Sequence, residues 1–268
     1  MSILANRIYY IDSEKRLAGT PSNFTYHLDI PDGANYDTAC VLSMTIPRSY
    51  YLIRQGQNMV TLLVDGMPNV ITVPKGNYNV RTFMSTLLPL LNAVLPGFTM
   101  TFNDITGKYN YTTTSTSVLA FQFIDPSRLG LQMGFDEVGT FTFASKTLDS
   151  QNVVDFVSTS TLFLHSDLVE DQTSILQEVY SDNTSPYSNL VYNCRFPGMY
   201  SKAMKIGNSG TINFSLTDEH DLEVNVNGHQ ILFTLLLYRK ENLSKLIKDI
   251  FVQMDDQYLF FVTTLWRA

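Results

Sequence analysis

The side chains that could do chemistry are few and lie far apart in the sequence. The four histidines, His27, His165, His220 and His229, do not follow the spacing of metal ligands. His165 and Asp167 fall on one face of an expected strand, a pattern more typical of a polar strand face than of a catalytic pair. The histidines therefore indicate neither a metal site nor an acid–base site.

Three short polar stretches are the other candidates. Asp218-Glu219-His220-Asp221 could offer carboxylate oxygens to a cation, but it is more typical of a hairpin turn. Gly207-Asn208-Ser209-Gly210 is faintly similar to a serine-protease nucleophile loop, yet it lacks the usual acidic residue, so we interpret it as a turn. Met254-Asp255-Asp256 is interpreted as a helix end.

The sequence contains no phosphate-binding loop, dinucleotide fingerprint, G-x-S-x-G elbow or H-E-x-x-H motif. We therefore expect no catalytic, cofactor-binding or metal-binding residue, no cofactor and no enzymatic activity.

The two cysteines, Cys40 and Cys194, are interpreted as buried free thiols, because two cysteines do not make a disulfide framework. The first seven residues lack the apolar core of a signal peptide. No window reaches the roughly 20 apolar residues that a membrane span needs. We expect synthesis in a reducing compartment, outside the secretory path, and no membrane span.

The composition indicates a protein that binds other proteins rather than nucleic acid. The chain has 268 residues, a formal net charge of -7 and only 16% charged residues. Direct binding of DNA or RNA requires a basic surface, which this balance does not provide. Low charge with 12% aromatic residues is typical of a β-rich subunit that buries much of its surface against partners.

The stretch Thr38–Ile46 is the clearest predicted strand. Cys40, Leu42, Met44 and Ile46 recur at period two, so we expect them on one face toward the core. The further strands predicted from alternation and turn signals are Asn23–Ile30, Met59–Val64, Val70–Val73, Phe98–Phe102, Lys108–Thr113, Leu119–Ile124, Gly139–Ser145, Val153–Val157, Ser160–Val169, Leu190–Tyr192, Gly210–Leu216 and Ile231–Tyr238.

Helices are fewer. Apolar residues from Val80 to Leu95 repeat at helical spacing after Asn79, a suitable N-cap. A short helix is predicted at Ser174–Tyr180, and a second amphipathic helix from Leu243 to Met254. Many short strands with a few helical turns predict an all-β antiparallel sandwich, a single jelly roll. We expect an N-terminal arm or edge strand at 1–22, a jelly-roll domain at 23–240, and a C-terminal helix and tail at 241–268.

Taken in order, several segments resemble one family, and together they span roughly residues 23 to 254. The family is the single jelly-roll penton, or minor capsid, proteins of virophages, polinton-like viruses and adintoviruses. The matching segments are Asn23–Ile30, Leu42–Ile53, Ile71–Tyr78, Leu129–Phe135, Leu162–Val169 and Ile231–Lys240.

The resemblance implies a structural protein of the virion. Such proteins form homo-pentamers at the fivefold vertices of an icosahedral double-stranded DNA virus capsid. The rest of that shell consists of a double jelly-roll major capsid protein. The resemblance transfers no active-site residue. It implies a location at the capsid vertex after assembly inside the host cell.

Two alternatives remain open from the residues. A jelly-roll attachment or glycan-binding protein, a spike or cement protein of the virion, would need an exposed aromatic and acidic sugar site. Asp218–Asp221 and Tyr187 are the candidates for it. A cupin-type enzyme would need histidines and a carboxylate clustered on neighbouring strands, which the scattered histidines do not supply.

Overall fold

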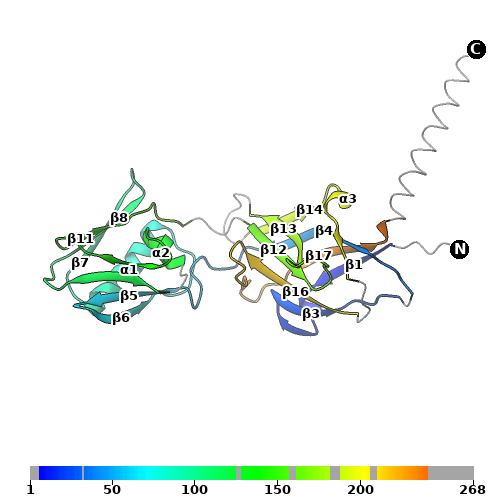
Figure 1. Ribbon diagram of the computed structural model, residues 1–268, viewed down its shortest axis with the longest axis horizontal. Helices are drawn as coiled ribbons and strands as arrows, with labels where there is room; N and C mark the ends of the chain where they lie inside the picture. Colours follow the sequence, from blue (N-terminus) through cyan, green and yellow to red (C-terminus); the bar gives the residue numbers. More distant parts are fainter. Residues whose placement is uncertain are drawn as a thin grey trace, which may run out of the picture. The chain divides into compact units, whose positions relative to one another are not determined.

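The computed structural model describes residues 6–31, 33–124, 128–156, 161–181, 188–205 and 210–240. The chain divides into two compact units (Figure 1). Unit 1 comprises Met1–Tyr50 and Thr159–Ala268, and unit 2 comprises Tyr51–Ser158. Unit 2 is therefore an insertion between two halves of unit 1 in the sequence.

Unit 1 contains two antiparallel sheets. In the first sheet, the order is β1 (Asn6–Asp12), β17 (Leu232–Tyr238), β4 (Thr38–Pro47) and β14 (Asn189–Asn193), with β15 (Lys202–Ala203) also on β4. In the second sheet, the order is β13 (Ile175–Tyr180), β12 (Thr161–Ser166), β16 (Thr211–Asp218), β3 (Asn23–His27) and β2 (Ala18–Thr20).

This strand order is that of a jelly roll. Leaving out the two shortest strands, β2 and β15, the eight strands of unit 1 in chain order occupy positions 1-8-3-6 in one sheet and 5-4-7-2 in the other. In each sheet, most neighbouring strands are thus not consecutive in the chain, and the orders 1-8-3-6 and 5-4-7-2 are those of two interlocked Greek keys. The expected all-β antiparallel sandwich with a single jelly roll is confirmed in unit 1.

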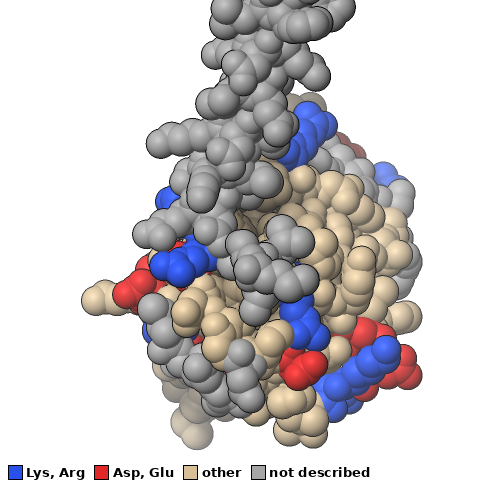
Figure 2. Space-filling model, turned by 90° about the vertical axis from the view of Figure 1, so that its right-hand side faces the viewer, with Lys and Arg blue, Asp and Glu red and all other residues tan. Residues whose placement is uncertain are grey.

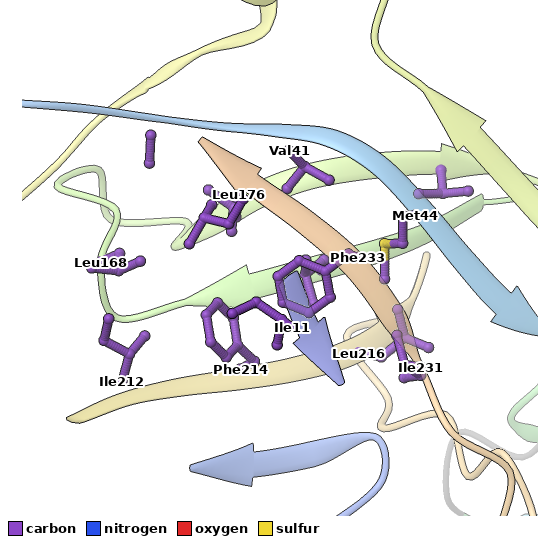
Figure 3. Close-up of a cluster of buried hydrophobic side chains, with 14 of the residues drawn as sticks. Ile11, Val41, Met44, Leu168, Leu176, Ile212, Phe214, Leu216, Ile231 and Phe233 are labelled. Atoms are coloured by element: carbon purple, nitrogen blue, oxygen red, sulfur yellow. The ribbon is translucent and has the colours of Figure 1, made fainter. Parts of the chain in front are cut away.

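The core of unit 1 lies between the two sheets. Apolar side chains of β17 and β4 face those of β12 and β16, and Phe214 meets Phe233 edge-on with ring centroids 5.0 Å apart. Figure 3 shows these side chains converging from both layers. Full burial of such side chains contributes about 1.5–3 kcal/mol each to the free energy of folding.

A β-bulge changes which face of β4 is buried. Thr234 of β17 pairs with Ser43, whereas the next residue, Leu235, pairs with Val41, so Leu42 is an extra residue in β4. The core side chains are consequently Ala39 and Val41 before the bulge, and Met44 and Ile46 after it.

The expected period-two face of Cys40, Leu42, Met44 and Ile46 is therefore wrong in its first half. The inserted residue reverses the alternation, and neither Cys40 nor Leu42 belongs to the core between the sheets.

Unit 2 has its own sheets. One has the order β10 (Gly139–Thr142), β9 (Leu119–Phe123), β5 (Met59–Val64) and β6 (Met67–Thr72). The other has the order β11 (Thr147–Asp149), β8 (Lys108–Thr113) and β7 (Phe98–Asn103). Its core is a separate cluster of aromatic rings, in which Phe121, Phe135 and Tyr111 are fully buried.

Short helices complete the two units. Helix α1 (Val80–Val94) begins at the expected N-cap, where the Asn79 Oδ1 accepts hydrogen bonds from the backbone N–H groups of Arg81 and Thr82 at 3.0 and 2.9 Å. Helix α2 (Arg128–Met133) also belongs to unit 2. Unit 1 contains the 3₁₀ turn η1 (Ser13–Lys15) and the single helical turn α3 (Pro197–Tyr200).

The domain boundaries differ from the expectation in one respect. The range 23–240 was expected to be one jelly-roll domain, but it contains all of unit 2 as well. The physical reason is that its buried apolar residues separate into two clusters with no shared member. At the N-terminus, β1 and β2 are edge strands of the two sheets rather than a free arm. The expected helix and tail at 241–268 lie outside the described residues.

We expect the two cores to respond separately to truncation. Leu164→Ala in unit 1 and Leu87→Ala in unit 2 each remove a fully buried side chain, at a cost of about 2–5 kcal/mol. Calorimetry should show that each variant lowers one of two unfolding transitions. A single transition lowered equally by both variants would contradict separate cores.

Candidate interaction surface

His165 takes part in the hydrogen bonding of the second sheet. Its Nδ1 lies 3.0 Å from the carbonyl oxygen of Thr173, and its Nε2 lies 2.9 Å from the Oγ1 of Thr217 on β16. Asp167 accepts from the backbone N–H and the side-chain amide of Asn213 at 3.0 and 2.8 Å. These two side chains connect neighbouring strands and do not contact each other in a catalytic arrangement.

The stretch Asp218–Asp221 forms a turn organised by a buried carboxylate. The Oδ1 of Asp218 accepts hydrogen bonds from the backbone N–H groups of His220 and Leu222 at 2.9 and 3.1 Å. Asp218 is fully buried, whereas Asp221 at the tip is exposed and has a φ of 59°. The Asp218 carboxylate is thus directed at its own backbone, as in an Asx turn.

The other sequence candidates are not brought together. His27 is the last residue of β3, and His229 lies in the loop before β17. Gly207–Ser209, Tyr187, Asp255 and Asp256 lie outside the described residues. Among the residues that the structure describes, no group of three or more His, Cys, Asp or Glu side chains could hold a metal ion. Within that same part of the chain, no helix is long and apolar enough to cross a membrane.

A groove lies at one flank of the sandwich in unit 1. Residues of β13, an edge strand of the second sheet, and of β14, an edge strand of the first sheet, line this groove. The segment 195–202, which includes α3, forms the rest of its wall. The groove has a volume of about 730 Å³.

The groove carries large apolar side chains that are open to solvent. Tyr180 is 65% exposed, Phe196 63%, Met199 76% and Tyr200 48%. An exposed cluster of this kind marks a protein interaction site more often than scattered single residues do. Tyr, Phe and Met are also the residue types enriched at the centres of protein interfaces.

Three charged residues line the same groove: Glu178, Arg195 and Lys202. A hydrogen bond to the Glu178 carboxylate, together with the charge of that carboxylate, raises the pKa of the Tyr180 phenol above its ordinary value. The phenol therefore stays neutral at physiological pH. The groove is consequently a largely apolar surface with charges of both signs.

The sequence did not predict this groove. Ser174–Tyr180 was expected to be a short helix, because Ile175, Leu176 and Val179 fall at helical spacing. The structure has the edge strand β13 there, with a register shift against β12 between Leu164 and His165. Because Leu176 is an extra residue in β13, the apolar residues of this strand do not alternate at period two. The expected strand Val153–Val157 also differs from the structure, because its described residues 153–156 are not in a strand.

The opposite flank of the jelly roll also exposes apolar side chains. Here the chain passes from β1, the edge of the first sheet, to β2, the edge of the second. Ile8 is 48% exposed, Tyr10 78% and Leu17 63%. Nearby, the guanidinium of Arg7 forms an ion pair with Asp29 at 3.2 Å. The two flanks therefore carry different apolar patches.

Charged side chains are sparse on the face shown in Figure 2. Most of its described surface is uncharged, and the Lys and Arg side chains form small separate groups, several of them beside Asp and Glu side chains. A surface of this kind loses little solvation of charge when a partner covers it.

No protein-family model matches this chain, and no curated protein matches it. Among solved structures, that of the mavirus penton protein is similar, with 13% sequence identity and a TM-score of 0.44, over 87% of this chain and 98% of that chain. The jelly-roll assignment therefore rests on the strand order of unit 1 and not on this likeness.

We expect the Asp218 turn to be a structural element. Asp218→Ala removes the carboxylate that accepts from two backbone N–H groups of the turn, and should lower the free energy of unfolding by about 1–3 kcal/mol in urea. Asp218→Asn retains the Oδ1 acceptor and should lose less. Equal losses in the two variants would contradict this role for the Oδ1 atom.

Proposed function

We propose that the protein is a structural capsid protein, a penton that forms pentamers at the fivefold vertices of an icosahedral double-stranded DNA virus capsid. Its partners are four further copies of itself and a double jelly-roll major capsid protein. The observation that carries the proposal is the strand order of unit 1, because jelly rolls recur in capsid and lectin domains and in cupins. The ordered segments that resemble virophage, polinton-like virus and adintovirus pentons favour the first of these.

A closed ring places a specific demand on the surface of the subunit. Each copy must present two different, complementary patches, because the contact around a fivefold axis is heterologous. The jelly roll carries exposed apolar residues on two opposite flanks, as this geometry requires. We assign the groove beside β13 and β14 to a second copy of the chain, which inserts its flank at β1 and β2.

This assignment gives each patch a defined role. Tyr10 and Ile8 are the side chains that enter, and Phe196 and Met199 are among those that receive them. The charges in the groove set the orientation of the contact more than its strength. The protein then acts by filling the vertex and joining its neighbours, and it belongs to the virion.

The native mass of the purified protein tests the proposal. We expect a mass close to five times 30.3 kDa by light scattering or native mass spectrometry at micromolar concentration. Co-expression with the major capsid protein should place the chain at particle vertices. A stable trimer would contradict the fivefold role. A monomer that stays absent from particles and binds glycans on an array would favour an attachment protein instead.

Two substitutions test the contact itself. Met199→Asp and Tyr10→Asp each put a carboxylate into an apolar interface, which should weaken ring formation at least about tenfold while leaving the fold intact. Ile105→Asp is the matched control, because Ile105 is 96% exposed but belongs to unit 2. If the control lowers the native mass as much as the two flank variants, the assigned flanks are wrong.

A further inference from the structure

The two cysteines of unit 1 lie next to each other. The Sγ atoms of Cys40 and Cys194 are 3.9 Å apart, although 154 positions separate the residues in the sequence. Both are free thiols; Cys40 is buried, and Cys194 is half-buried. The sequence alone predicted two separate buried thiols, and the proximity arises only from the pairing of β14 with β4.

The bulge in β4 brings these side chains together. Because Leu42 is an extra residue, Cys40 points away from the core between the sheets. On the other side, the backbone N–H of Cys194 donates to the carbonyl oxygen of Leu42 at 2.8 Å. Cys194 is thereby held beside β4, directly after the last residue of β14.

We propose that Cys40 and Cys194 form a reversible intramolecular disulfide, which closes when the protein meets a low-molecular-weight disulfide such as glutathione disulfide. A disulfide bond is about 2.05 Å long, so the sulfurs must approach by about 1.9 Å. Cys40 is fixed within a paired strand, whereas Cys194 lies outside the named strands and helices. The movement therefore falls to Cys194 and the segment after it.

The order of the chemical steps follows from burial. Cys40 is 0% exposed, and burial together with the neighbouring Cys194 raises its pKa to about 12, so it is a protonated thiol at physiological pH. The more accessible Cys194 reacts first. Its thiolate attacks one sulfur of glutathione disulfide, the S–S bond breaks, one glutathione thiolate leaves, and a mixed disulfide remains on Cys194.

The second step closes the protein disulfide. Cys40 attacks the Cys194 sulfur and loses its proton, the bond between Cys194 and glutathione breaks, and the departing glutathione takes up the proton as a thiol. In total, two protein thiols are oxidised to one disulfide, and one glutathione disulfide is reduced to two glutathiones. The phenols of Tyr192 and Tyr238 lie close to the pair, and burial raises the pKa of each, so both remain neutral during the exchange.

The bond would act on the groove. Arg195 follows Cys194 directly, and residues 195–202 form one wall of the groove. A disulfide between Cys194 and Cys40 of β4 would join this wall covalently to the first sheet. It also closes a covalent loop that contains all of unit 2, and long loops give disulfides their largest effect on the unfolded chain.

Intact-mass measurement after incubation with glutathione disulfide tests the proposal on the full chain. Wild type should lose two hydrogens and both thiols, with no glutathione attached at the end point. Cys40→Ala should stop with one glutathione on Cys194, because no second thiol resolves the mixed disulfide. Cys194→Ala should retain its single thiol and gain no mass.

A thermal scan provides the second readout. Oxidised wild type should unfold roughly 5–15 °C above the reduced protein, and dithiothreitol should reverse the shift. The two alanine variants should show no shift. A glutathione adduct that persists in wild type, or thiols that remain unreacted in the folded protein, would overturn the proposal, as would an oxidised form without higher thermal stability.

Discussion

The pairing of β4 with β17 is the constraint on which unit 1 depends. These strands lie side by side in the middle of the first sheet, and seven residues of β17 pair along β4. Each of the two contributes apolar side chains to the core between the sheets. The other strands of the first sheet attach to one or the other of them, β1 to β17 and β14 and β15 to β4.

This constraint also has a cost in chain entropy. β4 ends before unit 2 begins, and β17 is the last strand among the described residues, so the central pair joins distant parts of the sequence. Contacts of such long range are slow to form, because the loop must be closed before the strands stabilise each other. Unit 2 has its own core and its own pairing of neighbouring strands, such as β5 with β6 and β7 with β8. Its contacts are more local, and we infer that they form earlier.

The same geometry determines which surfaces are free to bind. A jelly roll closes its core between two sheets but leaves an edge strand at each end of each sheet. Near one flank, those edges combine with α3 to form the groove. Near the other, Tyr10 of β1 and Leu17, which directly precedes β2, are exposed. A ring of identical subunits covers both flanks at once, so the proposed assembly also protects the exposed edges. The cysteine pair lies between the groove and β4, since Cys194 directly precedes the groove wall and Cys40 belongs to β4.

Local features were determined by the sequence itself. The cap at Asn79 and the strands Ile231–Tyr238 and Lys108–Thr113 could be predicted, because capping and alternation depend on residues a few positions apart. The all-β class followed from their number. Tertiary structure alone decided the rest. Because Leu42 is an extra residue in β4, Cys40 faces away from the core between the sheets. That bulge exists only in the pairing of β4 with β17, in which the partners Ser43 and Thr234 are 191 positions apart.

The same holds for the candidate surface. The residues of β13 have a spacing that suits a helix, and only their pairing with β12 makes them a strand. The groove arises because β13 and β14 are the last strands of two different sheets, and strand order is a property of the whole fold. The separation of the apolar residues into two cores was likewise hidden, because the alternation within a strand does not show which distant strands share its core. Sequence specified the elements, and long-range pairing decided which of their faces remained available to a partner.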